Sequence, residues 1–249
     1  GGFGYATTDL AAIRHRVRDL HADRIIYVVG LPQSFHFEQV FAVARQAGYL
    51  PDGVRAEHVG FGSVLGADGK MLRTREGGTV TLEYLLDEAE AVAARPVAMA
   101  AVKYADLSTS LHKDYVFDLD RMTATTGNTG PYLQYAHARA SRILRNAAGL
   151  GLTVPDAVTL LDAPEEQSLA LLLSRFGEVV AEVGEHLQPH KLCNYLYELA
   201  TAMSVFYEQC PVLKSDGEVR ASRLALCAAT RKVLSKGLYL LGIDAPESM

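Results

Sequence analysis

Apolar and polar positions in the first third of the chain alternate between strand-like and helix-like spacing. The run 24–31 is almost wholly apolar and rich in β-branched residues, which is typical of a buried strand in a parallel sheet. Apolar residues recur at helical spacing over 37–47, and 57–65 has the pattern of a second strand. A further helix is expected to begin near residue 9. The order predicts a β-α-β unit of an open α/β sheet.

Turn and cap residues set the expected ends of these elements. Gly48 is predicted to end the helix that starts at residue 37, and 66–69 is predicted to form a turn. Thr81 could cap a helix that runs to about residue 94. The following stretch, 103–120, has a mixed pattern with one short β-like run at 114–117.

The second half of the chain has an almost continuous helical pattern. Three prolines stand where the first turn of a helix tolerates them: Pro131, Pro155 and Pro189. The expected helices span 131–148, 154–161, 165–187, 189–209 and 219–241. The change in composition near residues 120–130 predicts a boundary between a first domain, 1–125, and an all-helical second domain, 126–249.

Composition excludes several classes of protein. The 249 residues are 49% apolar and 21% charged, which is a globular mixture and not that of a disordered chain. No apolar run approaches the length of a membrane span. The net charge of −5 means that nucleic acid would have to bind at a local patch. Three scattered Cys without a CxxC pair are predicted to be buried thiols in the cytoplasm, and no metal site is expected.

Two groups of polar residues near the N-terminus are candidates for a ligand site. Tyr5 and Asp9 are four residues apart, so on a helix a phenol and a carboxylate share one face and could hold a guanidinium. The alternative is that Asp9 only caps the helix. Gln33 and His36 follow the first strand, where ligands bind in open α/β sheets, although a solvated turn has the same composition.

The loop 70–78 combines three cations, Lys70, Arg73 and Arg75, with the hydroxyl of Thr74 and two glycines. Cations and backbone donors on a Gly-rich loop suit a polyphosphate leaving group, whose charge grows in the transition state. A solvated basic hairpin is the alternative interpretation. The loop does not have the Walker A spacing, which disfavours a P-loop nucleotidase.

Tyr132 and Tyr135 open the helix predicted at 131–148, and Arg139, Arg142 and Arg145 follow on it at intervals of three. Tyrosine rings and guanidinium groups stack on unpaired bases and hold phosphates. A solvated basic face is the alternative. The pattern therefore predicts a local surface for single-stranded nucleic acid, provided that these side chains gather in space.

Several segments, taken in order, resemble the arginyl-tRNA synthetases, a family of class I aminoacyl-tRNA synthetases. The matching segments are YATTDLAA at 5–12, IYVVGLPQSFH at 26–36, KMLRTREGGTV at 70–80, AVKYADL at 101–107, DYVFD at 114–118, NTGPYLQY at 128–135 and LLGIDAPESM at 240–249. The family's first catalytic half, with its HIGH motif, has no counterpart here. The chain also looks shorter than its relatives between Ala94 and Val97, and it begins Gly-Gly-Phe-Gly without Met, which suggests a piece of a longer protein.

The resemblance implies roles for the candidate residues. It places Tyr5, Asp9 and Gln33 at the arginine substrate, with His36 and Gln39 elsewhere in the active site. It places Lys70, Arg73, Thr74 and Arg75 in a degenerate KMSKS loop that stabilises the phosphates of ATP. The residues implied to contact the tRNA anticodon loop are Tyr132, Tyr135, Arg139, Tyr207 and Met249.

The resemblance also implies a fold and an activity. The fold is an α/β part, the C-terminal half of a Rossmann-type class I catalytic domain, followed by an all-α helical-bundle anticodon-binding domain. The intact protein is expected to use Mg²⁺–ATP to ligate arginine to tRNA(Arg) in the cytoplasm, together with the missing N-terminal half and away from membranes.

The chain alone is expected to be inactive, because half of the ATP site is missing. A catalytically inactive synthetase-like fragment or paralogue that binds tRNA is the alternative, and an arginine-sensing regulator is a third possibility. A cysteinyl-type synthetase is disfavoured because no zinc-ligand set of Cys and His is found.

Overall fold

The computed structural model describes residues 2–73 and 80–249, so the predicted loop residues Thr74 and Arg75 lie outside the described residues. The chain forms two compact units. The first comprises 1–64 and 111–115, and the second comprises 65–110 and 116–249. Each unit is described by itself. The domain boundary expected between residues 125 and 126 stays a prediction.

The first unit is built on two parallel strands and two helices. In chain order its elements are α1 (Tyr5–Arg18), β1 (Arg24–Gly30), the 3-10 turn η1 (Leu31–Gln33), α2 (Ser34–Gln46) and β2 (Arg55–Phe61). β1 and β2 pair in parallel, with Arg24 opposite Arg55 and Gly30 opposite Phe61. The predicted β-α-β unit is therefore confirmed, and Gly48, at φ +69°, follows the end of α2 as expected.

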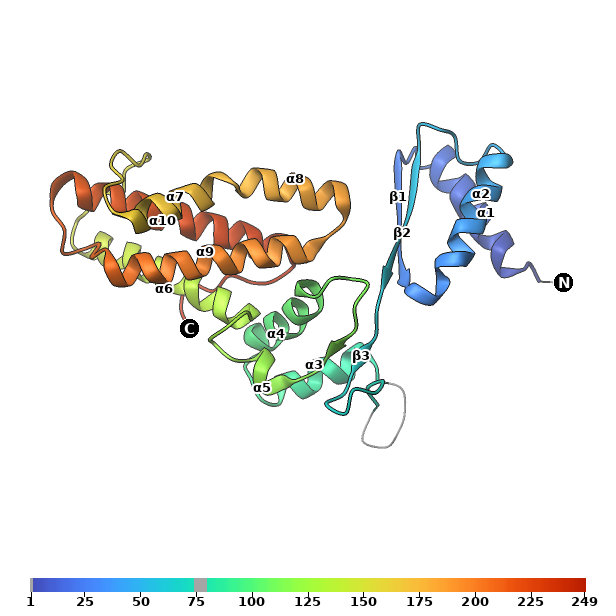
Figure 1. The fold of residues 1–249 in the computed structure, drawn as a ribbon, viewed down its shortest axis with the longest axis horizontal. Helices are drawn as coiled ribbons and strands as arrows, with labels where there is room; N and C mark the ends of the chain where they lie inside the picture. The colour runs from blue at the N-terminus through green and yellow to red at the C-terminus, as the bar shows by residue number, and fades with distance from the viewer. Residues whose placement is uncertain (1, 74–79) are drawn as a thin grey trace. The chain divides into compact units, whose positions relative to one another are not determined.

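Both helices of the first unit lie on one side of the strand pair (Figure 1). The apolar core on that side contains Ile13, Val40, Ala44 and Leu50. Ile25 of β1 is also buried, whereas its neighbours Ile26 and Val28 are 43% and 63% exposed. Because successive strand residues point to opposite faces, the face that carries Ile26 and Val28 is left uncovered within the described unit.

The strand predicted at 57–65 is interrupted, and this is a correction to the sequence analysis. β2 ends at Phe61 and a separate short strand, β3 (Val64–Leu65), pairs with β4 (Tyr115–Val116). At the break, the amide of Gly62 donates to the carbonyl of Leu111 at 2.8 Å. A Cβ on Gly62 would lie 2.6 Å from the carbonyl oxygen of Lys113, so the close approach of 111–114 requires glycine here.

The mixed stretch 103–120 begins inside a helix that starts before it, and the sequence analysis missed this helix. α3 (Leu82–Glu90) begins at the predicted cap, because Thr81 Oγ1 accepts a hydrogen bond from the Tyr84 amide at 3.2 Å. Residues 91–94 then lead directly into α4 (Arg95–Ser108), and α5 (Leu119–Met122) follows β4. α4 has buried residues around its surface, among them Ala98, Ala100, Ala101, Val102 and Tyr104. A helix covered on several sides has no polar stripe, so its periodicity is weak.

The rest of the second unit is a bundle of long helices (Figure 1). Its helices are α6 (Gly130–Gly149), α7 (Pro164–Ser174), α8 (Phe176–His186), α9 (Pro189–Gln209) and α10 (Gly217–Leu240). α9 packs against each of the other four, and the fully buried Leu196, Leu199 and Met203 lie on it. Pro131 and Pro189 stand in the first turns of α6 and α9, as predicted.

Two expectations for this bundle are wrong. The segment 154–161 is irregular and not helical, because Ser222 of α10 binds its backbone. Ser222 Oγ accepts from the amides of Thr159 and Leu160 and donates to the carbonyl of Leu160 at 2.6 Å. The helix expected over 165–187 is broken at Arg175, whose amide donates to the carbonyl three residues earlier before α8 begins.

Candidate active site and nucleic-acid interface

Tyr5, Asp9 and His36 form a cluster where α1 meets α2. His36 Nε2 donates to Asp9 Oδ2 at 2.7 Å, and the side chains of His36 and Asp9 are 22% and 17% exposed. The Tyr5 ring stacks on the His36 ring with centroids 4.7 Å apart. α1 begins at Tyr5 after Gly4, four residues earlier than expected, so Asp9 is inside the helix and does not cap it. Tyr5 and Asp9 share a helix face as predicted.

Gln33 lies directly beyond the carboxyl end of β1, as the sequence predicted. It is the last residue of η1 and is exposed. Ser34 Oγ donates to the carbonyl of Leu31 at 2.7 Å, which fixes the start of α2 and therefore the direction of His36. Gln39, one turn further along α2, is also exposed. The proposed substrate roles of Gln33 and Gln39 stay predictions.

Aromatic side chains of β1, β2 and α2 pack next to this cluster, and Phe37 contacts the His36 ring edge-on. Phe37, which is 2% exposed, packs its ring on Tyr27 and stacks on His58 with centroids 4.9 Å apart. Arg16 Nη1 donates to the Tyr27 hydroxyl at 2.6 Å. Burial raises the pKa of Tyr27; the Arg16 charge opposes the rise and the nearby Asp9 charge adds to it. Tyr27 therefore remains a neutral phenol at neutral pH.

Lys70 and Arg73, in the second unit, follow a tight turn. The turn predicted at 66–69 is confirmed: the Gly69 amide donates to the Gly66 carbonyl at 2.9 Å, and Gly69 has φ +72°. The Lys70 amide donates to Asp68 Oδ1 at 3.1 Å. Both cationic side chains are exposed and border a pocket that is also lined by Gly66, Asp68, Met71 and Leu72. Two of the four residues predicted to act on ATP phosphates are thus described, and their role stays a prediction.

Four of the five residues predicted to contact RNA line one cavity of the second unit. Tyr135, Arg139, Tyr207 and Met249 all border a cavity of about 690 Å³, which we call the α6–α9 groove. The Arg139 guanidinium carbon lies 4.8 Å from the Tyr135 ring centroid and 5.1 Å from that of Tyr207. Arg139 also donates to the Tyr135 hydroxyl at 3.2 Å, which lowers the pKa of that phenol. Arg142 lines the same groove.

Tyr132 is the predicted RNA-binding residue that lies elsewhere. It is not among the described residues that line the groove. Its ring packs edge-on against Tyr197 with centroids 5.7 Å apart, and its hydroxyl lies 3.3 Å from Ser204 Oγ. Arg139 Nη1 also donates to Ser204 Oγ, at 3.4 Å. Tyr132 is therefore linked to the groove through Ser204 and Arg139.

Three side chains of α6 hold the C-terminal tail, and the sequence analysis did not find this role. Each donates a hydrogen bond to one main-chain carbonyl of the tail. Gln134 Nε2 donates to Asp244 at 2.9 Å, His137 Nδ1 to Pro246 at 2.9 Å, and Arg145 Nη1 to Glu247 at 2.8 Å. These contacts place Met249 at the groove. The available signal was polar residues at buried positions of a helix, since Gln134 and His137 are 0% and 4% exposed.

The potential metal-ligating side chains and the three cysteines are spread apart in the part of the chain that the structure describes. Among residues 2–73 and 80–249, no group of three or more His, Cys, Asp or Glu is arranged to hold a metal ion. Cys193, Cys210 and Cys227 are free and buried, as predicted, and burial raises the pKa of Cys193 and Cys227 to about 12. Within the same described ranges, no helix has the length and apolar character needed to cross a bilayer.

Two family models match separate parts of the chain. The model for the catalytic domain of class I (R) tRNA synthetases matches residues 1–97. The model for the DALR anticodon binding domain matches residues 133–249.

Curated relatives named arginine–tRNA ligase match the whole chain. The relative from Cutibacterium acnes is 66% identical, and the chain covers 47% of it. The relative from Frankia casuarinae is 54% identical, and the chain covers 45% of it. The chain thus spans about half the length of the curated relatives that it matches.

Solved structures have the same fold. The arginyl-tRNA synthetase from Plasmodium falciparum superposes on the whole chain with a TM-score of 0.84 at 29% identity, and 45% of that protein is covered. The arginyl-tRNA synthetase from Thermus thermophilus superposes on 92% of the chain with a TM-score of 0.77 at 32% identity, with 41% of that protein covered.

Proposed function

Because the chain belongs to the arginyl-tRNA synthetase family, we propose that the intact protein uses ATP to ligate arginine to tRNA(Arg). The observation that carries this proposal is 66% identity, over the whole chain, to a relative of that name. Both parts of the expected fold, a class I catalytic part and a helical anticodon-binding part, are confirmed by the matching models. We place the reaction in the cytoplasm.

The cluster at α1 and α2 supports arginine binding. The Asp9 carboxylate accepts hydrogen bonds from the substrate guanidinium, an interaction that is charge-assisted and directional. His36 Nε2 already holds one carboxylate oxygen of Asp9 at 2.7 Å, so the carboxylate is oriented before the substrate arrives. Tyr5 and Gln33 supply further polar groups around the same ligand, and Gln39 acts elsewhere in the active site.

Catalysis then rests on charge stabilisation. The arginine carboxylate attacks the α-phosphorus of ATP, an arginyl-adenylate forms, and pyrophosphate leaves. A terminal ribose hydroxyl of the tRNA next attacks the arginyl carbonyl, and AMP leaves. Four residues of the loop stabilise the negative charge that grows on the leaving pyrophosphate, namely Lys70, Arg73, Thr74 and Arg75. Mg²⁺ enters with ATP as part of the substrate.

The α6–α9 groove is the proposed site for the anticodon loop. Unpaired bases of RNA loops stack on aromatic rings and guanidinium planes. Tyr135 and Tyr207 are 40% and 47% exposed although Arg139 lies over both rings, so each retains surface for a base. Met249 supplies an apolar wall, and Tyr132 supports Arg139 through Ser204.

The test is aminoacylation by the intact protein. Purified enzyme with Mg²⁺–ATP, labelled arginine and tRNA(Arg) is expected to give arginyl-tRNA, and lysine in place of arginine is expected to give none. Transfer of a different amino acid, or no transfer by an enzyme that binds tRNA, would contradict the proposal. The latter result would instead favour a catalytically inactive tRNA-binding paralogue.

A further inference from the structure

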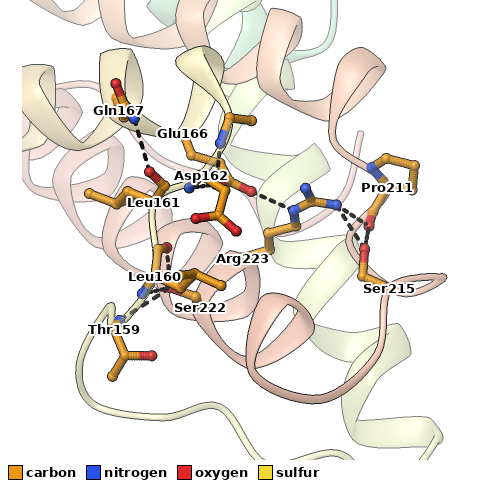
Figure 2. Close-up of polar contacts among 11 residues, drawn as sticks. Thr159, Leu160, Leu161, Asp162, Glu166, Gln167, Pro211, Ser215, Ser222 and Arg223 are labelled. Atoms are coloured by element: carbon orange, nitrogen blue, oxygen red, sulfur yellow. Dashed lines mark hydrogen bonds and ion pairs between the residues drawn. The ribbon is translucent and has the colours of Figure 1, made fainter.

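A buried ion pair joins α7 to α10 away from the groove itself. Glu166 and Arg223 have side chains that are 3% and 14% exposed, and Arg223 Nε donates to Glu166 Oε1 at 2.6 Å (Figure 2). Glu166 Oε2 accepts from the amides of Asp162 and Ala163 at 2.8 and 3.0 Å. The Glu166 carboxylate is therefore hydrogen-bonded on both oxygens, as a buried charge requires.

The other end of the Arg223 guanidinium holds the turn between α9 and α10. Arg223 Nη1 donates to the Pro211 carbonyl at 3.1 Å and to Ser215 Oγ at 2.7 Å (Figure 2). Ser215 Oγ itself donates to the same carbonyl. A single planar guanidinium thus connects α7 to both ends of the segment 211–215. Lysine, with one ammonium group, has no such fork.

The segment held in this way is one wall of the α6–α9 groove. Residues 211–214 line the groove together with Tyr135 and Arg139. Arg223 is not one of the described residues that line it, so Arg223 connects to a ligand in the groove through this wall and not by direct contact. Val212 is 6% exposed and anchors the wall in the core, while Lys214 is the cation of the wall.

We infer that Arg223, oriented by Glu166, is a positioning residue for RNA in the α6–α9 groove. It fixes the wall 211–214 at a set distance from the Tyr135 and Arg139 side, so that the groove is formed before RNA binds. A preformed site binds more tightly because less ordering accompanies binding. This inference rests on the proposed binding of the tRNA anticodon loop in the groove.

The experiment compares variants of this chain in binding to an RNA hairpin with the tRNA(Arg) anticodon loop, measured by fluorescence anisotropy. Arg223→Met is expected to weaken binding roughly 3- to 30-fold, the range for residues that act without touching the ligand. Arg223→Lys keeps the charge but loses the fork, and it is expected to recover only part of the affinity. Arg220→Met is the matched control, since Arg220 is one turn earlier on α10 and pairs with the exposed Asp216; it is expected to change affinity less than about twofold.

A second measurement separates positioning from general damage. Hydrogen exchange of the amides of 212–215 is measured in the RNA-free chain, and thermal melting reports whether each variant is folded. Exchange is expected to rise in both Arg223 variants and to stay unchanged in Arg220→Met. If Arg223→Met does not fold, Arg223→Lys and Ser215→Ala decide the question, because each removes only part of the contact.

The possible outcomes have different meanings. Faster exchange of the amides of 212–215 together with weaker RNA binding supports the inference. Unchanged affinity in folded Arg223 variants overturns it while leaving the proposed function intact, and so does an equal loss in Arg220→Met, which would indicate bulk charge alone. If the unaltered chain does not bind the hairpin, the proposed RNA site itself fails, and the inference fails with it.

Discussion

Asp9 and Asp19 stand near opposite ends of α1 and provide a natural comparison, because each carboxylate is held by a histidine. Asp9 accepts from His36 of α2 at 2.7 Å and is mostly covered, whereas Asp19 pairs with His15 of its own helix and is 65% exposed. Only Asp9 has the partly desolvated surroundings in which a charge-assisted hydrogen bond to a ligand is strong. This difference leads to a prediction for arginine binding.

Asp9→Asn in the intact enzyme is expected to raise the KM for arginine roughly 10- to 100-fold, the value of a lost hydrogen bond to a charged group. Arginine-dependent exchange of pyrophosphate into ATP measures it. Asp19→Asn is the matched control and is expected to leave that KM unchanged. Equal effects of the two substitutions would show that Asp9 does not bind the guanidinium.

His137 predicts how stability depends on pH. Burial lowers its pKa below the usual 6.5; its hydrogen bond to the Pro246 carbonyl opposes that shift, and the Arg231 charge adds to it. The unfolded chain therefore binds a proton at a higher pH than the folded chain does. The resulting stability is complete above about pH 6.5 and is lost as the pH falls below it.

Urea unfolding at pH 7.5 and pH 5.5 is expected to show a lower free energy of unfolding at pH 5.5. His137→Asn retains a donor near the Nδ1 position but cannot titrate, so the difference between the two pH values is expected to shrink. An unchanged difference in this variant would assign the pH effect to other groups, such as His190, whose pKa burial also lowers.

How far single residues could be predicted depends on whether their partners are local. The four-residue spacing of Tyr5 and Asp9 is local, so their shared helix face followed from the sequence. The contact of Asp9 with His36 spans 27 positions and exists only because α1 packs on α2. The role of Gln134 depends on a tail 110 positions away, which no local pattern contains.

At the scale of elements, α6 has a glycine at each end, and the space around the first is crowded while the space around the second is open. A Cβ on Gly130 would lie 2.3 Å from the carbonyl oxygen of Ala100, where α6 crosses α4. Nothing lies within 4 Å of a Cβ on Gly149. The first glycine is required by a close helix approach, and the second is not.

Gly130→Ala is therefore expected to destabilise the chain by about 1–3 kcal/mol, the usual cost of forcing extra volume into a packed interior. Gly149→Ala, in the same helix, is expected to be neutral or to stabilise by about 0.5–1 kcal/mol. Denaturant unfolding of both variants measures this. A Gly130→Ala variant as stable as the parent would mean that α4 and α6 can separate freely.

The helices that were predicted correctly and those that were not differ in the range of the contacts that determine them. Local caps such as Thr81 and first-turn prolines such as Pro131 act within a few residues, and those boundaries were predicted. The segment 154–161 has a suitable proline but lies outside any helix because Ser222, more than 60 positions away, binds its backbone. α4 was missed because burial on several sides removes the amphipathic pattern.

At the scale of the whole molecule, the chain alone is expected to bind RNA but not to attach arginine to tRNA. It contains no HxGH-like sequence and spans about half of its relatives. With Mg²⁺–ATP, arginine and tRNA(Arg), it is expected to give no arginyl-tRNA above background, while an anticodon hairpin still binds. Robust charging by the 249-residue chain would contradict this and would require a complete ATP site within it.

Net charge and local chemistry also separate at this scale. A chain with a net charge of −5 repels RNA on average, yet Arg139, Arg142 and Lys214 gather on one groove. Composition could not predict this grouping of charges. Lys214 is in the turn after α9, far from Arg139 and Arg142 in the sequence, and the fold brings all three to the same groove. The family resemblance identified the part that we propose to bind RNA, and the three-dimensional arrangement adds the wall 211–214 and the C-terminal tail.

The fixed C-terminal tail has a practical consequence for anyone who purifies this protein. Ser248 and Met249 border the groove, and the carbonyls just before them are tied to α6. An affinity tag fused directly after Met249 would begin at the groove and is expected to compete with RNA at the proposed site. Binding data from a chain tagged directly after Met249 are therefore expected to understate the affinity of the proposed site for RNA.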